Sequence, residues 1–166
     1  CHPFSIPDLF FDRCKSAFNG DYTTDLHLIY HDRDFDFEQK LLNQQYPDRE
    51  ILVAVYRNLR LLAKNREFLE RGMFISSTMQ SANISEDAIL NALTVLADLE
   101  LVTNHLDSSE IKVLSSKKCE LNASKIYQHG EEIKMMSEDF AGILRKSSED
   151  IWKRINYEFG KLNSID

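Results

Sequence analysis

The residues best suited to bind a metal ion form an acidic run near the start of the chain. Histidine beside carboxylates can bind a divalent cation, and such residues often follow a strand in α/β layers. However, the spacing matches no defined metal motif, and carboxylates also favour the positive first turn of a helix. We therefore predict a helix start and no metal site. A metal-dependent enzyme using this run is one hypothesis. The run reads His31-Asp32-Arg33-Asp34-Phe35-Asp36-Phe37-Glu38.

A second group combines cations with an apolar residue on one predicted helix. At about 100° per residue, four cations fall within one quadrant and Val53 lies among them. Such a surface can dock single-stranded DNA, or an acidic peptide with an apolar end. The same pattern is typical of an ordinary solvated helix face, and Glu50 reduces its positive field. The candidate partner- or DNA-binding residues are Arg49, Val53, Arg57, Arg60 and Lys64. No catalytic residue is predicted.

The elements that carry these residues predict an α+β fold that is mainly helical. Residues 47–116 are expected to form a winged helix-turn-helix domain. Asp48 caps its first helix, a short second helix surrounds Phe74, and Ser85 caps the third. Two short strands follow, at 101–103 and 111–114, with a polar loop between them as the wing.

Two smaller segments flank the predicted winged helix. Residues 1–46 are expected to form a small α/β segment, a β-α-β unit followed by a helix at 34–45. Residues 117–166 are expected to be a C-terminal helical segment, because apolar residues recur there at helical spacing.

The third helix of a winged helix usually enters the major groove of DNA. Its outward face here presents two carboxylates and no cation. Those carboxylates would face phosphates, which lowers affinity. The residues are Asp87, Asn91, Thr94 and Asp98. A base-reading role is therefore not expected.

Composition limits the partners and the setting of the chain. The formal net charge of −7 over 166 residues argues against a protein whose main task is gripping a phosphate backbone. The three cysteines form no CxxC pair, which favours a reduced, cytoplasmic setting. No membrane segment is expected. The sequence begins without methionine inside an apolar stretch, so we expect a piece of a longer polypeptide.

Several motifs occur in a characteristic order. An apolar strand at 26–30 precedes an acidic helical stretch, and then the run 46–60, Tyr-Pro-Asp-Arg-Glu-Ile-Leu-Val-Ala-Val-Tyr-Arg-Asn-Leu-Arg. The winged helix and the segment Ala-Ser-Lys-Ile-Tyr at 123–127 follow. This arrangement resembles the C-terminal domain of bacterial RecJ-type single-stranded-DNA exonucleases, members of the DHH superfamily. The resemblance covers 26–127.

The resemblance implies a non-catalytic accessory domain that makes partner or DNA contacts during DNA repair or recombination. In that family a separate core with Asp-His-His motifs and manganese or magnesium performs the 5′–3′ hydrolysis. No Asp-His-His run occurs here, so no catalytic residue or cofactor is expected in this chain. The implied partners are the acidic tail of single-stranded-DNA-binding protein, single-stranded DNA and the rest of the exonuclease. The alternative is a winged-helix transcription regulator with a helical oligomerisation tail.

Overall fold

The computed structural model describes residues 32–64, 66–103, 109–114 and 119–144. These residues fold mainly into helices, with a small three-stranded antiparallel sheet. The mainly helical α+β class expected from the sequence is thus confirmed. One compact unit spans Lys40–Glu132, and the described residues on either side of it belong to a second unit. The expected β-α-β segment, the wing loop at 104–108 and everything after 144 lie outside the described residues.

The first two described helices are separated by a Tyr-Pro-Asp connection. Helix α2 (Asp32–Gln45) ends before Pro47, and α3 (Arg49–Leu62) begins directly after Asp48. The Asp48 Oδ1 accepts a hydrogen bond of 2.8 Å from the backbone N–H of Ile51, which satisfies one unpaired donor of the first turn. The cap predicted at Asp48 is confirmed.

A short strand and two helices follow α3. Strand β1 (Leu69–Glu70) leads directly into α4 (Arg71–Ala82). Asn83 ends α4 in the left-handed conformation, with φ of 52°, which asparagine tolerates better than most residues. The Ser85 Oγ then accepts a 3.4 Å hydrogen bond from the N–H of Ala88, at the start of α5 (Glu86–Asp98).

The three strands form one antiparallel sheet in the order β1-β3-β2. Strand β3 (Glu110–Val113) lies in the middle and pairs Ile111 with Leu69 of β1. On its other side it pairs Val113 with Val102 of β2 (Val102–Thr103). The two strands predicted from the sequence are found within one residue of their expected ends. Strand β1 was not predicted, because two residues cannot show an alternating pattern.

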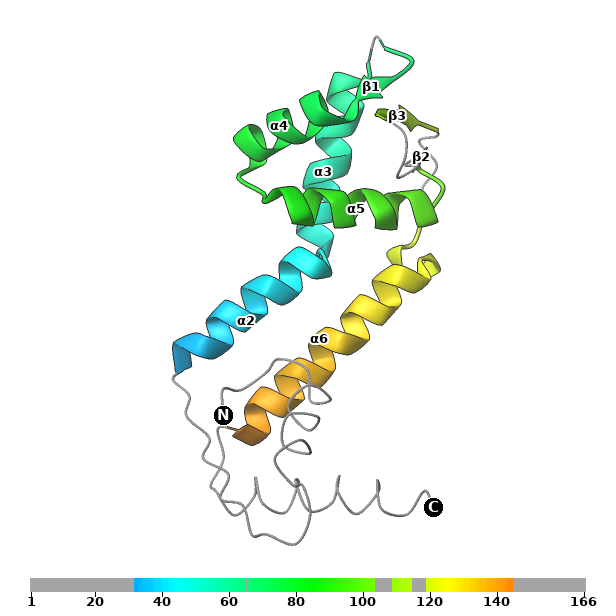
Figure 1. The fold of residues 1–166 in the computed structure, drawn as a ribbon. Helices are drawn as coiled ribbons and strands as arrows, with labels where there is room; N and C mark the ends of the chain where they lie inside the picture. Colours follow the sequence, from blue (N-terminus) through cyan, green and yellow to red (C-terminus); the bar gives the residue numbers. More distant parts are fainter. Residues whose placement is uncertain (1–31, 65, 104–108, 115–118, 145–166) are drawn as a thin grey trace, which may run out of the picture. The chain divides into compact units, whose positions relative to one another are not determined.

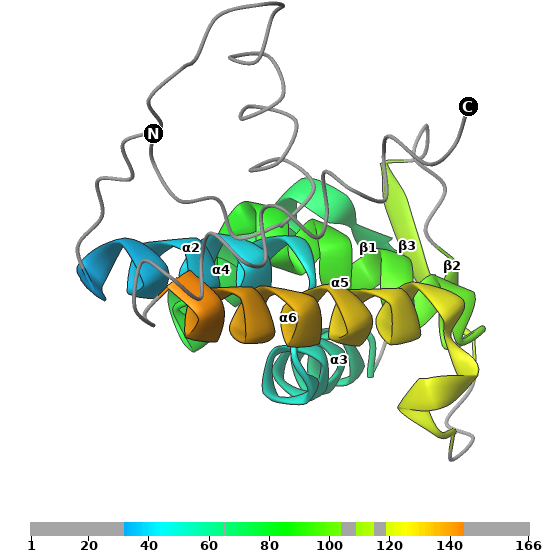
Figure 2. The ribbon, with the colours of Figure 1, turned by 90° about the horizontal axis from the view of Figure 1, so that it is seen from below.

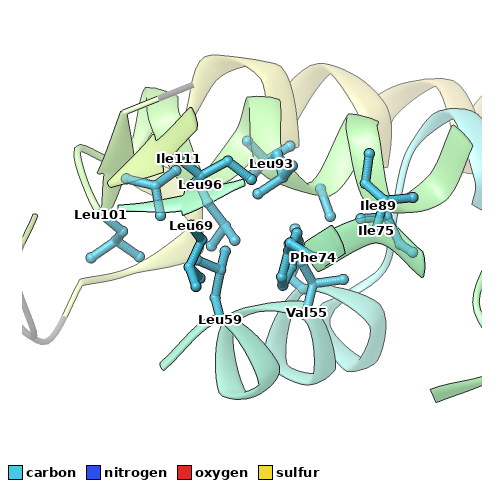
Figure 3. Close-up of a cluster of buried hydrophobic side chains, with 14 of the residues drawn as sticks. Val55, Leu59, Leu69, Phe74, Ile75, Ile89, Leu93, Leu96, Leu101 and Ile111 are labelled. Carbon is cyan, nitrogen blue, oxygen red and sulfur yellow. The ribbon is translucent and has the colours of Figure 1, made fainter. Parts of the chain in front are cut away.

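The hydrophobic core joins α3, α4, α5 and the sheet. Figure 3 shows side chains from all of these elements pointing into one cluster, with Phe74 of α4 beside Val55 of α3. Phe74, Val55 and Ile111 have no exposed surface. Burying such side chains stabilises the fold by about 1.5–3 kcal/mol each. The core therefore fixes which face of α3 turns inward.

Helices α3 and α5 cross each other within the Lys40–Glu132 unit. Helix α3 stands upright in Figure 1 and is seen end-on in Figure 2, whereas α5 lies lengthwise in both views. After the sheet, a short 3-10 turn (Leu121–Ala123) leads into α6 (Lys125–Leu144). The helical character predicted for the chain after 117 is confirmed for this part.

Candidate functional site on helix α3

Four of the five candidate binding residues lie along the exposed side of α3, and the fifth, Lys64, follows two residues after the helix ends. We call Arg49, Val53, Arg57, Arg60 and Lys64 the α3 stripe; all five are exposed. The spacing of three to four residues puts Arg49, Val53, Arg57 and Arg60 on successive turns of one helix face. At 1.5 Å per residue this part of the stripe extends for about 17 Å. The structure thus brings the four helical residues onto one face of α3, and Lys64 lies just beyond it.

The opposite side of α3 explains why the stripe faces solvent. Leu52, Val55 and Leu59 are at most 1% exposed and contribute to the core. With the apolar side buried, residues half a turn away must point outward.

Leu61 is a member of this surface that the sequence analysis missed. Its side chain is 66% exposed, more than the 45% of Val53. Positions 53, 57 and 61 follow one another at four-residue intervals, so Val53 and Leu61 lie one turn before and one turn after Arg57. The signal was present in the sequence, because Leu61 falls outside the inward-facing positions of the wheel.

Three cations of the stripe differ from Lys112 of β3 in whether they form an ion pair. Arg57, Arg60 and Lys64 form no ion pair with any residue that the structure describes. Lys112 of β3, in contrast, pairs with Glu67 at 3.3 Å and lies 5.0 Å from the ring centre of Phe68. Glu50 is exposed on the same side of α3 and reduces the net charge of the stripe.

The outward face of α5 contacts other parts of the chain. The Asn91 Nδ2 donates a hydrogen bond of 2.9 Å to the carbonyl of Gln44 at the end of α2. The Asp98 Oδ2 accepts a hydrogen bond of 2.6 Å from the Ser124 hydroxyl. Ser124 also accepts from the N–H of Tyr127 at 3.1 Å, and so caps α6. A helix held in this way cannot enter a DNA groove unless these contacts break.

No relative of this chain was found among known proteins: no protein-family model, curated protein or solved structure matches it.

The acidic run at 31–38 starts a helix, as predicted. Helix α2 begins at Asp32, so Asp32 and Asp34 fall in its first turn, at the positive end of the helix. Asp36 is exposed and Glu38 is half-buried, whereas the side chains of His31, Asp32 and Asp34 lie outside the described residues. Among the side chains that the structure describes, no group of three or more His, Cys, Asp or Glu residues is arranged to hold a metal ion. In the same part of the chain, no helix has both the length and the apolar character of a membrane span.

Proposed function

We propose that this chain is a non-catalytic accessory domain of a RecJ-like single-stranded-DNA exonuclease. In this proposal the α3 stripe docks an acidic segment of a partner protein during DNA repair or recombination. The observation that carries it is the row of exposed cations on α3 with the exposed side chains of Val53 and Leu61 among them. The link to the exonuclease rests on the sequence resemblance.

We further propose that the Lys40–Glu132 unit is a winged helix in which α5 has lost its usual task. The order helix, strand, two helices and two strands is that of a winged helix, and the β1-β3-β2 order agrees with it. In such a domain α5 would read DNA. Its bonds to Gln44 and Ser124 support a role inside the protein, and they weigh against a transcription regulator.

An acidic peptide fits the stripe better than a DNA strand does. A phosphate backbone needs only cations, whereas exposed Val53 and Leu61 provide contacts for apolar side chains. The net charge of −7 opposes general attraction of nucleic acid. Single-stranded-DNA-binding proteins of bacteria end in an acidic tail with an apolar last residue, which matches both features. We therefore propose this tail as the partner.

The test is titration of a fluorescently labelled acidic tail peptide against the 166-residue chain. Charge-assisted contacts contribute about 1.5–3 kcal/mol when partly buried and much less on an open face. We expect binding in the micromolar range that weakens as salt increases. Reversing two central charges with Arg57→Glu and Arg60→Glu should weaken binding about tenfold or more.

A matched control separates the stripe from general charge. Lys40→Glu with Lys125→Glu makes the same change in net charge at two exposed lysines outside the stripe, and should change affinity less than about threefold. Circular dichroism checks that each variant is folded. Equal loss in both double variants, or tighter binding of single-stranded DNA than of the peptide, would contradict the proposal.

A further inference from the structure

A separate pocket of about 200 Å³ lies within the Lys40–Glu132 unit. Residues of the α2–α3 connection, α5 and the first turns of α6 line it. Pro47 and Val95 are buried parts of the wall, and Tyr46, Ile126 and Tyr127 make most of the remaining wall apolar. A cavity of about 150 Å³ is enough to accept a benzene ring. The pocket therefore has the size and the lining for one aromatic ring.

Most polar groups in the wall are already paired within the protein. Asn91 donates to the carbonyl of Gln44 at 2.9 Å. Thr94 donates to a carbonyl of its own helix at 3.1 Å. The ionisable groups among the lining residues other than Tyr46 are the phenol of Tyr127 and the carboxylate of Glu131. The Tyr127 phenol is neutral below its raised pKa, so Glu131, which also has an interaction within the protein, is the member of this pair that brings negative charge to the wall.

The electrostatic environment of Tyr127 indicates the sign of that charge. Burial raises the pKa of the Tyr127 phenol above its usual value, and the carboxylates of Glu131 and Asp48 raise it further. The guanidinium of Arg49 acts in the opposite direction. Of the two carboxylates, that of Glu131 stands in the wall of the apolar pocket, where it also has an interaction within the protein. A ligand with a ring and a cation would complement both features.

We propose that this pocket receives one aromatic side chain of a partner protein, presented next to an arginine or lysine that lies beside Glu131. The pocket holds a single ring and is partly open, so the cation and the backbone carrying it must lie outside, along the surface. This arrangement suits a side chain on a polypeptide. The site uses none of the α3 stripe as lining, so it stands or fails independently of the proposed function.

Three capped tripeptides test the ring and the charge separately. The first is Arg-Phe-Arg, the second replaces both arginines by glutamate, and the third replaces phenylalanine by alanine. Binding to the ¹⁵N-labelled 166-residue chain is followed by chemical-shift changes. We expect about millimolar affinity for Arg-Phe-Arg, because so small a ligand makes few contacts. The other two peptides should bind at least about fivefold more weakly, because each lacks one of the two complementary features.

Two variants locate the binding in the pocket. Thr94 is exposed at the rim, so Thr94→Phe can fill the space without disturbing the core and should weaken Arg-Phe-Arg about tenfold. Glu131→Gln keeps the shape and removes the charge, and should weaken it about threefold. The stripe variant Arg57→Glu with Arg60→Glu serves as a control that should keep full affinity. Unchanged binding to Thr94→Phe, or equal binding of the arginine and glutamate peptides, would overturn the proposal.

Discussion

Gly130 of α6 offers a sharp test of how the start of this helix packs. Gly130 is buried against Tyr46 of the α2–α3 connection. A Cβ atom at position 130 would lie 2.9 Å from the Cβ of Tyr46 and 3.0 Å from its Cδ1. The Tyr46 Cβ is attached to the backbone, so rotating the side chain cannot relieve the first contact. Gly130→Ala therefore has to move the helix or the connection.

The expected size of the effect follows from two opposing terms. Alanine stabilises a helix interior by about 1 kcal/mol relative to glycine. Overpacking a close contact typically costs about 1–3 kcal/mol. We therefore expect Gly130→Ala to lower the free energy of unfolding by up to about 2 kcal/mol, and the pocket beside Tyr46 to change shape.

Two other glycines provide controls for the helix term. In α4, a Cβ at exposed Gly72 would meet only the Glu70 Oε1, at 3.1 Å, and that carboxylate can rotate away. In α6, a Cβ at Gly142 would meet nothing within 4 Å. Both alanine variants should be neutral or up to about 1 kcal/mol more stable. Urea unfolding, compared at constant m-value, measures the differences. If Gly130→Ala were as stable as Gly72→Ala, the close approach to Tyr46 would be refuted.

Two further predictions concern ionisation and catalysis. Because the pKa of Tyr127 is raised, its neutral form stabilises the fold below about pH 10, and that contribution is lost as pH rises through the folded pKa. In an ultraviolet titration, Tyr127→Phe should lose one tyrosine that ionises above the usual pKa of about 10. The isolated chain should not degrade single-stranded DNA with magnesium or manganese, and degradation abolished by Asp34→Ala with Asp36→Ala would contradict the accessory-domain proposal.

The elements that sequence reasoning recovered are those fixed by neighbouring residues. The caps at Asp48 and Ser85 act within one turn of their own helices. Each leaves a pattern of residue types only a few positions long. Strand β1 left no such pattern. Its two residues are paired with β3, and a pairing across about forty residues has no local signature.

In the candidate site, too, the features that depend on neighbouring residues were predicted, and those that join distant parts of the chain were not. The exposure of the α3 stripe followed from helical periodicity, which depends only on α3 itself. Leu61 was left out of the predicted surface, although its wheel position is not an inward-facing one and apolar side chains contribute much of the surface of a folded protein. The pocket was not predicted at all. Its wall joins residues 45–47 to residues far along the chain, and a helical wheel carries no information on such contacts.

Helices α3 and α5 of the Lys40–Glu132 unit differ in how free their outward side chains are to bind a partner. In α5 the polar outward residues Asn91 and Asp98 are paired with Gln44 and Ser124. The Ser124 hydroxyl is buried, so exchanging its bond to Asp98 for a contact with DNA would leave a buried donor without a partner, at about 1–3 kcal/mol. The cations of α3 carry no such obligation within the described residues, so using them breaks no existing ion pair. For this reason a partner that needs cations and apolar contact gains more at α3 than at α5, although α5 is the helix that would read DNA in the winged helix proposed above.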